Sequence, residues 1–163
     1  MIHLRPVDDA GFAAFVERAI PRRAERWTRR GLWRAENAIE TSRREYAETF
    51  PQGRATPGHH IFEVVDDTGS IVGEAWYSAR TNGGKVDFYI QWIAIWPEHR
   101  GRGLGTALLG LLEGEARRLG ADRASLTVWE DNPEALALYT RLGYTTVHRN
   151  LIKLLDDVAP PGR

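Results

Sequence analysis

The chain has 163 residues and 42% hydrophobic composition, which suits one domain whose core needs no metal or disulfide. Its 22 basic residues balance 22 acidic ones, so bulk charge does not favour nucleic acid as a partner. Cysteine is absent, which excludes disulfide scaffolds, thiolate metal sites and thiol nucleophiles. Because we find neither an apolar signal core near the start nor a run approaching the ~18 residues of a membrane span, we expect an intracellular, cytoplasmic protein.

The first third of the chain predicts one strand and two helices. Residues 2–7 alternate apolar with polar side chains, as in a strand. A helix with its apolar face over residues 12–19 follows, and Pro21 is expected to bend or end it. A second helix is predicted over residues 33–50. Residues 50–60 contain two prolines and two glycines and predict a loop.

Arginines gather over the predicted helices. Such a basic face could contact RNA, an anionic membrane or the phosphates of a ligand, but interspersed glutamates favour a solvated helix face. We therefore expect no nucleic-acid partner and no membrane partner. The arginines are Arg18, Arg22, Arg23, Arg26, Arg29, Arg30 and Arg34.

The remainder predicts three consecutive strands and then alternating helices and strands. Predicted strands are residues 61–65, 71–78, 86–95, 125–129 and 144–155, with helices from about 104 to 119 and over 133–142. This order predicts a mixed α+β domain over residues 1–155, with a mostly antiparallel sheet of about six or seven strands and about four helices. The tail, residues 156–163, is predicted to be flexible.

The strand ending at Ile95 runs into a glycine cluster, R-G-R-G-L-G, at the start of a helix. The cluster lacks the lysine of the Walker pattern, and its spacing does not match the dinucleotide fingerprint G-x-G-x-x-G. Glycines let backbone N–H groups approach a ligand, and a helix N-terminus favours negative charge. A pyrophosphate site and a ligand-free tight turn both stay open on this cluster alone.

A second motif follows at residues 132–144, NPEALALYTRLGY. Together, I-x-P-x-x-R-G-x-G-x-G and N-x-x-A-x-x-x-Y-x-x-x-G-[FY] closely resemble the GNAT superfamily of N-acetyltransferases. The residues that carry the resemblance are Ile95, Pro97, Arg100, Gly101, Gly103, Gly105, Asn132, Ala135, Tyr139, Gly143 and Tyr144.

The resemblance implies a GNAT-like fold with acetyl-CoA as co-substrate, splayed between the strands that end near Ile95 and Trp129. It places the pyrophosphate on the glycine turn and the pantetheine arm along the preceding strand, with Asn132 bonding the pantetheine or capping its helix. It also makes Tyr139 the general acid that protonates the leaving thiolate. The implied cofactor-binding residues are Ile93, Ala94, Ile95, Arg100, Gly101, Arg102, Gly103, Leu104, Gly105, Thr106 and Asn132.

The general base is not singled out by the sequence. The strand before the glycine turn carries one acid, Asp87, and several groups elsewhere compete with it. Two histidines without a second cluster at ligand spacing make a metal site improbable, so no metal is expected. The other candidates are Glu74, Gln91 acting through a water, Glu98, Glu130, His59 and His60.

These observations leave two functions in competition. One is an acetyl-CoA-dependent N-acetyltransferase that transfers acetyl directly to a primary amine of a small molecule, amino acid or peptide. The absence of cysteine favours this direct attack in a ternary complex. The alternative is a non-catalytic acyl-CoA-binding or sensing domain. The oligomeric state stays open, a homodimer included.

Overall fold

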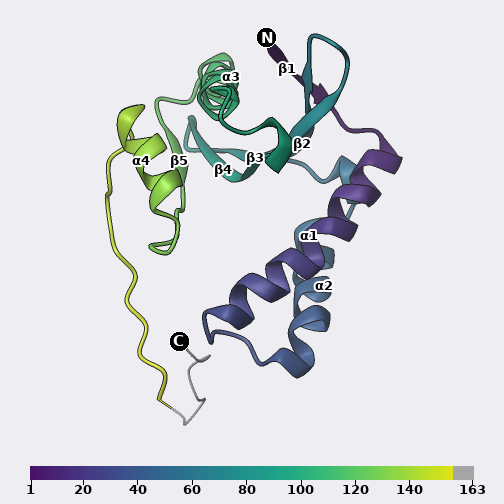
Figure 1. Ribbon diagram of the computed structural model, residues 1–163, viewed down its shortest axis with the longest axis vertical. Helices are drawn as coiled ribbons and strands as arrows, with labels where there is room; N and C mark the ends of the chain where they lie inside the picture. The colour runs from purple at the N-terminus through teal and green to yellow at the C-terminus, as the bar shows by residue number, and fades with distance from the viewer. Residues whose placement is uncertain (156–163) are drawn as a thin grey trace. The chain divides into compact units, whose positions relative to one another are not determined.

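The computed structural model describes residues 1–155, so the predicted flexible tail lies outside the described residues. The chain forms two compact units. We call Met1–Val7 with Pro57–Thr146 the sheet unit, and Asp8–Thr56 with the described residues that follow Thr146 (147–155) the helical unit. Figure 1 shows the elements of each unit along the chain.

The sheet unit is built on five strands in the spatial order β1-β2-β3-β4-β5. The first four strands pair antiparallel, and β5 joins β4 in parallel. This arrangement confirms the predicted mixed, mostly antiparallel sheet. The strands are β1 (Ile2–Pro6), β2 (His59–Asp66), β3 (Ile71–Asn82), β4 (Lys85–Ile95) and β5 (Ala124–Leu126).

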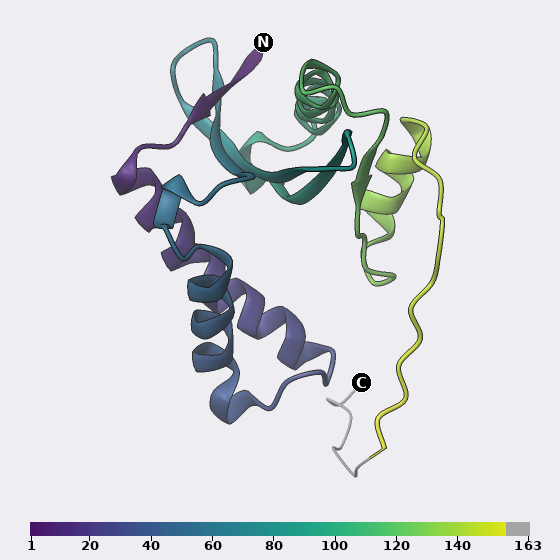
Figure 2. The same cartoon turned by 180° about the vertical axis from the view of Figure 1, so that it is seen from behind.

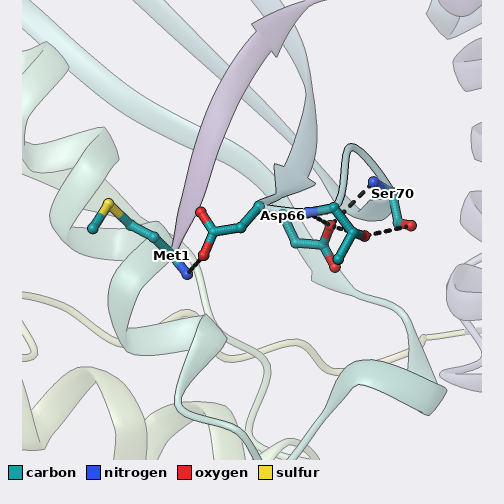
Figure 3. A network of polar contacts seen from close by, with 5 residues as sticks. Met1, Asp66 and Ser70 are labelled. Carbon is teal, nitrogen blue, oxygen red and sulfur yellow. Dashed lines mark hydrogen bonds and ion pairs between the residues drawn. The ribbon is translucent and has the colours of Figure 1, made fainter.

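The turn between β2 and β3 is held by side chains of its own residues. The Asp66 carboxylate accepts hydrogen bonds from the Thr68 hydroxyl (2.6 Å) and from the backbone N–H groups of Thr68 (2.9 Å) and Ser70 (3.0 Å) (Figure 3). The N-terminal ammonium of Met1 pairs with Asp67 in the same turn. These contacts explain why the predicted turn forms where it does, since Asp and Ser side chains stabilise tight turns through their own backbone.

Helix α3 (Leu104–Arg118) covers one face of the sheet (Figures 1 and 2). Its apolar residues recur at helical spacing, and Leu108, Leu109 and Leu112 are fully buried. They pack against strand residues that alternate toward the same face, among them Tyr77 and Phe88, whose ring centroids lie 4.5 Å apart. This core fixes β4 and the start of α3 relative to each other.

The second helix of the sheet unit, α4 (Pro133–Arg141), follows β5 through a loop. Its inward residues, Leu138, Tyr139 and Leu142, pack against the same core. The helix ends at a turn in which Gly143 takes a left-handed conformation (φ 91°). The fold therefore brings the ends of both sequence motifs to one core.

The helical unit contains α1 (Asp9–Arg29), α2 (Ala38–Thr49) and two short 3₁₀ turns, η1 (Ala35–Asn37) and η2 (Gly53–Ala55). Asp8 caps α1 by accepting from the Gly11 N–H at 2.7 Å, and the helix continues through Pro21 instead of ending there. Of the predicted basic face, Arg23 pairs with Glu45 of α2 and lies 5.2 Å from the ring centroid of Trp27. This arginine of the basic face is therefore engaged by contacts within the helical unit.

Three features of the sheet differ from the sequence prediction. The described residues form five strands, fewer than the six or seven expected. The strand predicted over 125–129 ends at Leu126, and residues 144–155 contain no strand. A strand needs a neighbouring edge with which to exchange hydrogen bonds, and an apolar pattern in the sequence does not reveal whether that edge is present. The four predicted helices are confirmed.

Candidate functional site

Strands β4 and β5 separate halfway along β4. Their pairing covers only three residue pairs, from Phe88–Ala124 to Ile90–Leu126, whereas β4 itself continues to Ile95. The register between β3 and β4 shifts at the same point, leaving Gln91 as a bulge residue between Ile90 and Trp92. A bulge adds local twist and bends its strand, so it helps to turn β4 away from β5. The predicted splay is therefore confirmed, with β5 ending at Leu126.

The separated part of β4 directs backbone groups away from β3. The Trp96 N–H donates to the Val72 carbonyl at 2.9 Å, so the residues that alternate with Trp96 turn their N–H groups to the other side. These are Ile95 and Ile93. Along the separated part of β4, β5 makes no ladder pairs with them. Two amide donors thus face the splay, where a carbonyl oxygen could accept from them.

The glycine turn leads from β4 into α3. Gly101 and Gly103 both have φ of 74°, which residues with a side chain rarely adopt, and a Cβ atom added at either would meet nothing within 4 Å. Gly103 is the N-cap of α3 and offers no side chain to the first turn. The amides of Leu104, Gly105 and Thr106 belong to that first turn, where a helix supplies no partner. The turn therefore presents an open, uncapped helix N-terminus, which favours an anion.

The neighbouring arginines stabilise the turn in this structure. The Arg100 guanidinium donates through Nε to the Ile95 carbonyl at 3.0 Å, and Arg102 contacts the Glu98 carbonyl at 3.4 Å. Both side chains are exposed at the mouth of the turn. Gly105 has a packing role instead, since a Cβ there would lie 3.3 Å from Leu138 Cδ2 on α4.

Helix α4 positions the second motif. Asn132 is its N-cap, and the side-chain oxygen accepts from the Ala135 N–H at 3.2 Å, with Pro133 in the first turn. Tyr139 lies seven residues further, which places it near the Asn132 face of the helix. It is half-buried, its ring centroid lies 5.8 Å from that of Tyr144, and burial raises the pKa of its phenol. A raised pKa keeps the hydroxyl protonated and able to donate.

Several predicted base candidates have hydrogen-bond partners within the sheet unit. Glu74 on β3 is 2% exposed and accepts from Trp92 Nε1 at 2.8 Å. Gln91 donates through Nε2 to the Ser78 hydroxyl at 3.0 Å. His59 accepts at Nδ1 from Trp76 Nε1 at 3.1 Å.

Burial lowers the pKa of His59, and the nearby Arg80 and His60 lower it further. Burial also lowers the pKa of His60, whose ring stacks on Tyr77 at 4.8 Å between centroids. Both shifts favour the neutral imidazole. Asp87, Glu98 and Glu130, the remaining acids considered, are exposed.

Within residues 1–155, no group of three or more histidine, cysteine, aspartate or glutamate side chains is placed to hold a metal ion. None of the helices in that part of the chain is both long and apolar enough to cross a bilayer.

The fold and the two motifs define a class of acyltransferase, and comparisons with known proteins agree. The sequence profile of the acetyltransferase (GNAT) family matches residues 22–144, so the chain belongs to the GNAT acetyltransferase family. It is 28% identical to YdgE and 27% identical to YycN of Bacillus subtilis, both designated uncharacterized N-acetyltransferases. These matches cover 93% and 88% of this chain and 97% and 92% of the relatives.

The crystal structure of YycN superposes with a TM-score of 0.88 at 26% identity, covering 96% of this chain and all of that one. A further match, 32% identical over 97 residues, is the mycothiol acetyltransferase of Jonesia denitrificans. It spans 59% of this chain and 30% of that protein. These matches support the family and the fold.

The sequence does not predict the bulge and the side-chain contacts that shape the site. The bulge at Gln91 has no sequence signature, because it is defined by register across two strands. The Arg100–Ile95 contact and the Tyr89–Thr127 hydroxyl contact, which bridges β4 to the residue after β5, depend on folded geometry. The glycine turn itself is predicted by the number of its glycines and by their position before a helix.

Proposed function

We propose that the protein is an acetyl-CoA-dependent N-acetyltransferase whose acceptor is a primary amine of a small molecule, amino acid or peptide. The observation that carries the proposal is the junction of two features in β4 and α3. The strand separates from β5 after Ile90 and ends five residues later at Ile95, and the turn that follows leads to an uncapped helix N-terminus. We assign residues 1–155 to this activity as one functional domain.

The glycine turn would hold the pyrophosphate of the co-substrate. The amides of Leu104, Gly105 and Thr106 supply donors, the helix adds positive partial charge, and the open space at Gly101 and Gly103 admits the phosphates. Arg100 and Arg102, exposed beside the turn, are the side chains that would add charge-assisted hydrogen bonds.

The pantetheine arm would run along the separated part of β4, at Ile93, Ala94 and Ile95. There the strand no longer pairs with β5, so an amide-containing arm can take the place of the missing neighbour. The N–H groups of Ile93 and Ile95 would donate to the thioester oxygen as negative charge develops on it. Asn132 would add a contact from the α4 N-terminus while capping the helix.

The chemistry is a direct transfer. The amine nitrogen attacks the thioester carbonyl carbon, the carbon–sulfur bond breaks, and the Tyr139 hydroxyl gives its proton to the departing thiolate. The proton lost by the amine passes to water. Of the base candidates, Glu74, Gln91 and His59 are already engaged in hydrogen bonds within the sheet unit. No cysteine is present in the chain to carry an acyl group between half-reactions.

The test is release of coenzyme A thiol from acetyl-CoA with a panel of amines: amino acids, polyamines, amino sugars and short peptides with free N-termini. Turnover with at least one amine is expected. The competing function is a non-catalytic acyl-CoA sensor. Tight acetyl-CoA binding without turnover on any amine would favour the sensor and overturn the enzyme.

A further inference from the structure

Strands β4 and β5 are held together by a short ladder. Only three residue pairs join them, and parallel pairing is slightly less stable per residue than antiparallel pairing. Two side-chain hydrogen bonds reinforce this ladder, one near each end. At its start, the Ser125 hydroxyl donates to the Phe88 carbonyl at 3.2 Å. At its far end, the Tyr89 and Thr127 hydroxyls share a hydrogen bond.

The Tyr89–Thr127 pair lies at the vertex of the splay. Thr127 is the first residue after β5, so the pair ties β4 to the chain one residue beyond the last ladder pair, Ile90–Leu126. Phe88 and Ile90 belong to the α3 core, so Tyr89 between them points to the opposite face of the sheet. On that face its long side chain reaches diagonally past the end of the ladder.

The two chains diverge from this vertex toward the proposed co-substrate contacts. β4 continues to Ile95, with the N–H groups of Ile93 and Ile95 on the side of the splay. The other chain continues from Thr127 to Asn132, the N-cap of the helix that carries Tyr139. The separation at the vertex therefore sets how far the β4 amides lie from the start of the second motif.

We propose that Tyr89 and Thr127 are positioning residues for acetyl transfer, and we call the pair the vertex clasp. The clasp fixes the separation between β4 and the chain after β5, so that the pantetheine arm can contact both sides at once. This inference rests on the proposed function, which assigns the arm to the splay. Neither hydroxyl takes part in the chemical step, but a displacement of the thioester by about 1 Å can lower the rate by about 10²-fold.

The first test compares two ligands by calorimetric titration. Acetyl-CoA uses the glycine turn and the splay, whereas ADP has a pyrophosphate for the turn and no pantetheine arm. Tyr89→Phe and Thr127→Val each remove one hydroxyl and keep the shape of the side chain. We expect acetyl-CoA to bind either variant about fivefold more weakly, with ADP affinity changed by less than about twofold. Thr127→Ser keeps a hydroxyl and should retain acetyl-CoA affinity.

Two controls separate a clasp from general support of the sheet. Ser125→Ala removes the other side-chain bond between β4 and β5, at the paired end of the ladder, and should leave both affinities within about twofold of the wild-type values. The double variant Tyr89→Phe/Thr127→Val should bind acetyl-CoA no more weakly than either single variant, because the two hydroxyls share one hydrogen bond.

Backbone hydrogen exchange examines the vertex without any ligand. In Tyr89→Phe, the amides of residues 124–126 should exchange at least about threefold faster than in the wild-type chain, because the short ladder opens more often. The amides of β2 and β3, which are paired on both sides, should keep their rates. Unchanged exchange in residues 124–126 would show that the hydroxyl pair does not hold the vertex.

The binding outcomes are distinct from one another. Wild-type affinity for acetyl-CoA in both hydroxyl variants overturns the clasp and leaves the proposed function intact. Equal weakening of acetyl-CoA and ADP overturns it as well, since the pair would then only support the fold. A wild-type chain that does not bind acetyl-CoA removes the proposed function and the positioning role together.

Discussion

Tyr139 is the side chain whose chemistry can be separated most cleanly from its packing. Its ring packs against the core and Tyr144, while its hydroxyl is the proposed proton donor. Tyr139→Phe keeps the ring, so we predict that kcat falls by roughly 10²–10⁴-fold with acetyl-CoA affinity little changed. Thiol release and calorimetric titration measure the two quantities.

The neighbouring Tyr144 supplies a matched control for this variant. Burial and the negative charge of Glu113 raise its pKa to about 12, and it lies on the turn after α4. Tyr144→Phe removes a hydroxyl from the same aromatic pair, and kcat should change by less than about threefold, well below the loss expected of a general acid. An unaltered rate in Tyr139→Phe would show that the thiolate leaves without help from this residue.

The raised pKa of Tyr139 also predicts the pH dependence. The active form is the protonated one, and burial favours it, so activity is lost only as pH rises through a pKa above the ordinary value of about 10. The kcat profile should therefore show no fall that depends on Tyr139 between pH 7 and pH 10. A descending limb below pH 9 that disappears in Tyr139→Phe would contradict this environment.

At the scale of the element, the glycine turn tests whether an open helix N-terminus binds phosphate. In Gly103→Asn, the introduced asparagine adopts the left-handed backbone more readily than most residues do. Its side chain, however, occupies the space that is open at Gly103. We expect the variant to fold normally and to bind acetyl-CoA at least tenfold more weakly, because the added side chain occupies the phosphate position. Gly103→Val should lose binding as well, with added backbone strain.

The control for the glycine turn lies on the same helix. Gly114 is exposed in α3, and a Cβ there meets nothing within 4 Å, so Gly114→Ala should raise stability by about 0.5–1 kcal/mol without touching binding. Normal acetyl-CoA affinity in Gly103→Asn would mean that the glycines serve only the turn.

At the N-terminus of α4, two substitutions distinguish the capping role of Asn132 from a contact between Asn132 and the ligand. Asn132→Ala removes the bond to the Ala135 N–H and should lower the free energy of unfolding by about 1 kcal/mol, measured by denaturant titration. Asn132→Asp keeps the cap and should retain stability, yet it exchanges the carboxamide donor for an anion. If Asn132 also contacts pantetheine, acetyl-CoA affinity falls in Asn132→Asp. Equal affinity would leave the residue a cap alone.

The elements differ in how far sequence alone could predict them. The sequence predicts the start of α3 at Leu104 and the Asn132 cap. Both depend on local chemistry, because glycine and asparagine have backbone and capping preferences that do not depend on distant residues. The end of β5 at Leu126 and the unpaired residues 144–155 were not, because strand pairing depends on a distant edge. The bulge at Gln91 was not predicted for the same reason, because it is defined by pairing with another strand.

At the scale of the whole molecule, the proposed co-substrate contacts all belong to the sheet unit. The separated part of β4, the glycine turn, Asn132 and Tyr139 lie between residues 57 and 146, so binding stabilises that unit directly. At a concentration 100 times Kd, acetyl-CoA should add about 2.7 kcal/mol to the free energy of unfolding. For a chain of this size, that corresponds to a rise of about 5–10 °C in Tm.

Differential scanning calorimetry with increasing acetyl-CoA measures this rise and shows whether the helical unit unfolds in the same transition. Desulfo-CoA, which keeps the pyrophosphate and pantetheine but lacks the thioester, should retain most of the shift, because the glycine turn and β4 supply most contacts. Gly103→Asn, with its at least tenfold weaker binding, should lower the shift by about half or more for both ligands, whereas Tyr139→Phe should keep it. A Tm that does not respond to either ligand in the wild-type chain would remove acetyl-CoA from the proposed function, whatever the amine panel shows.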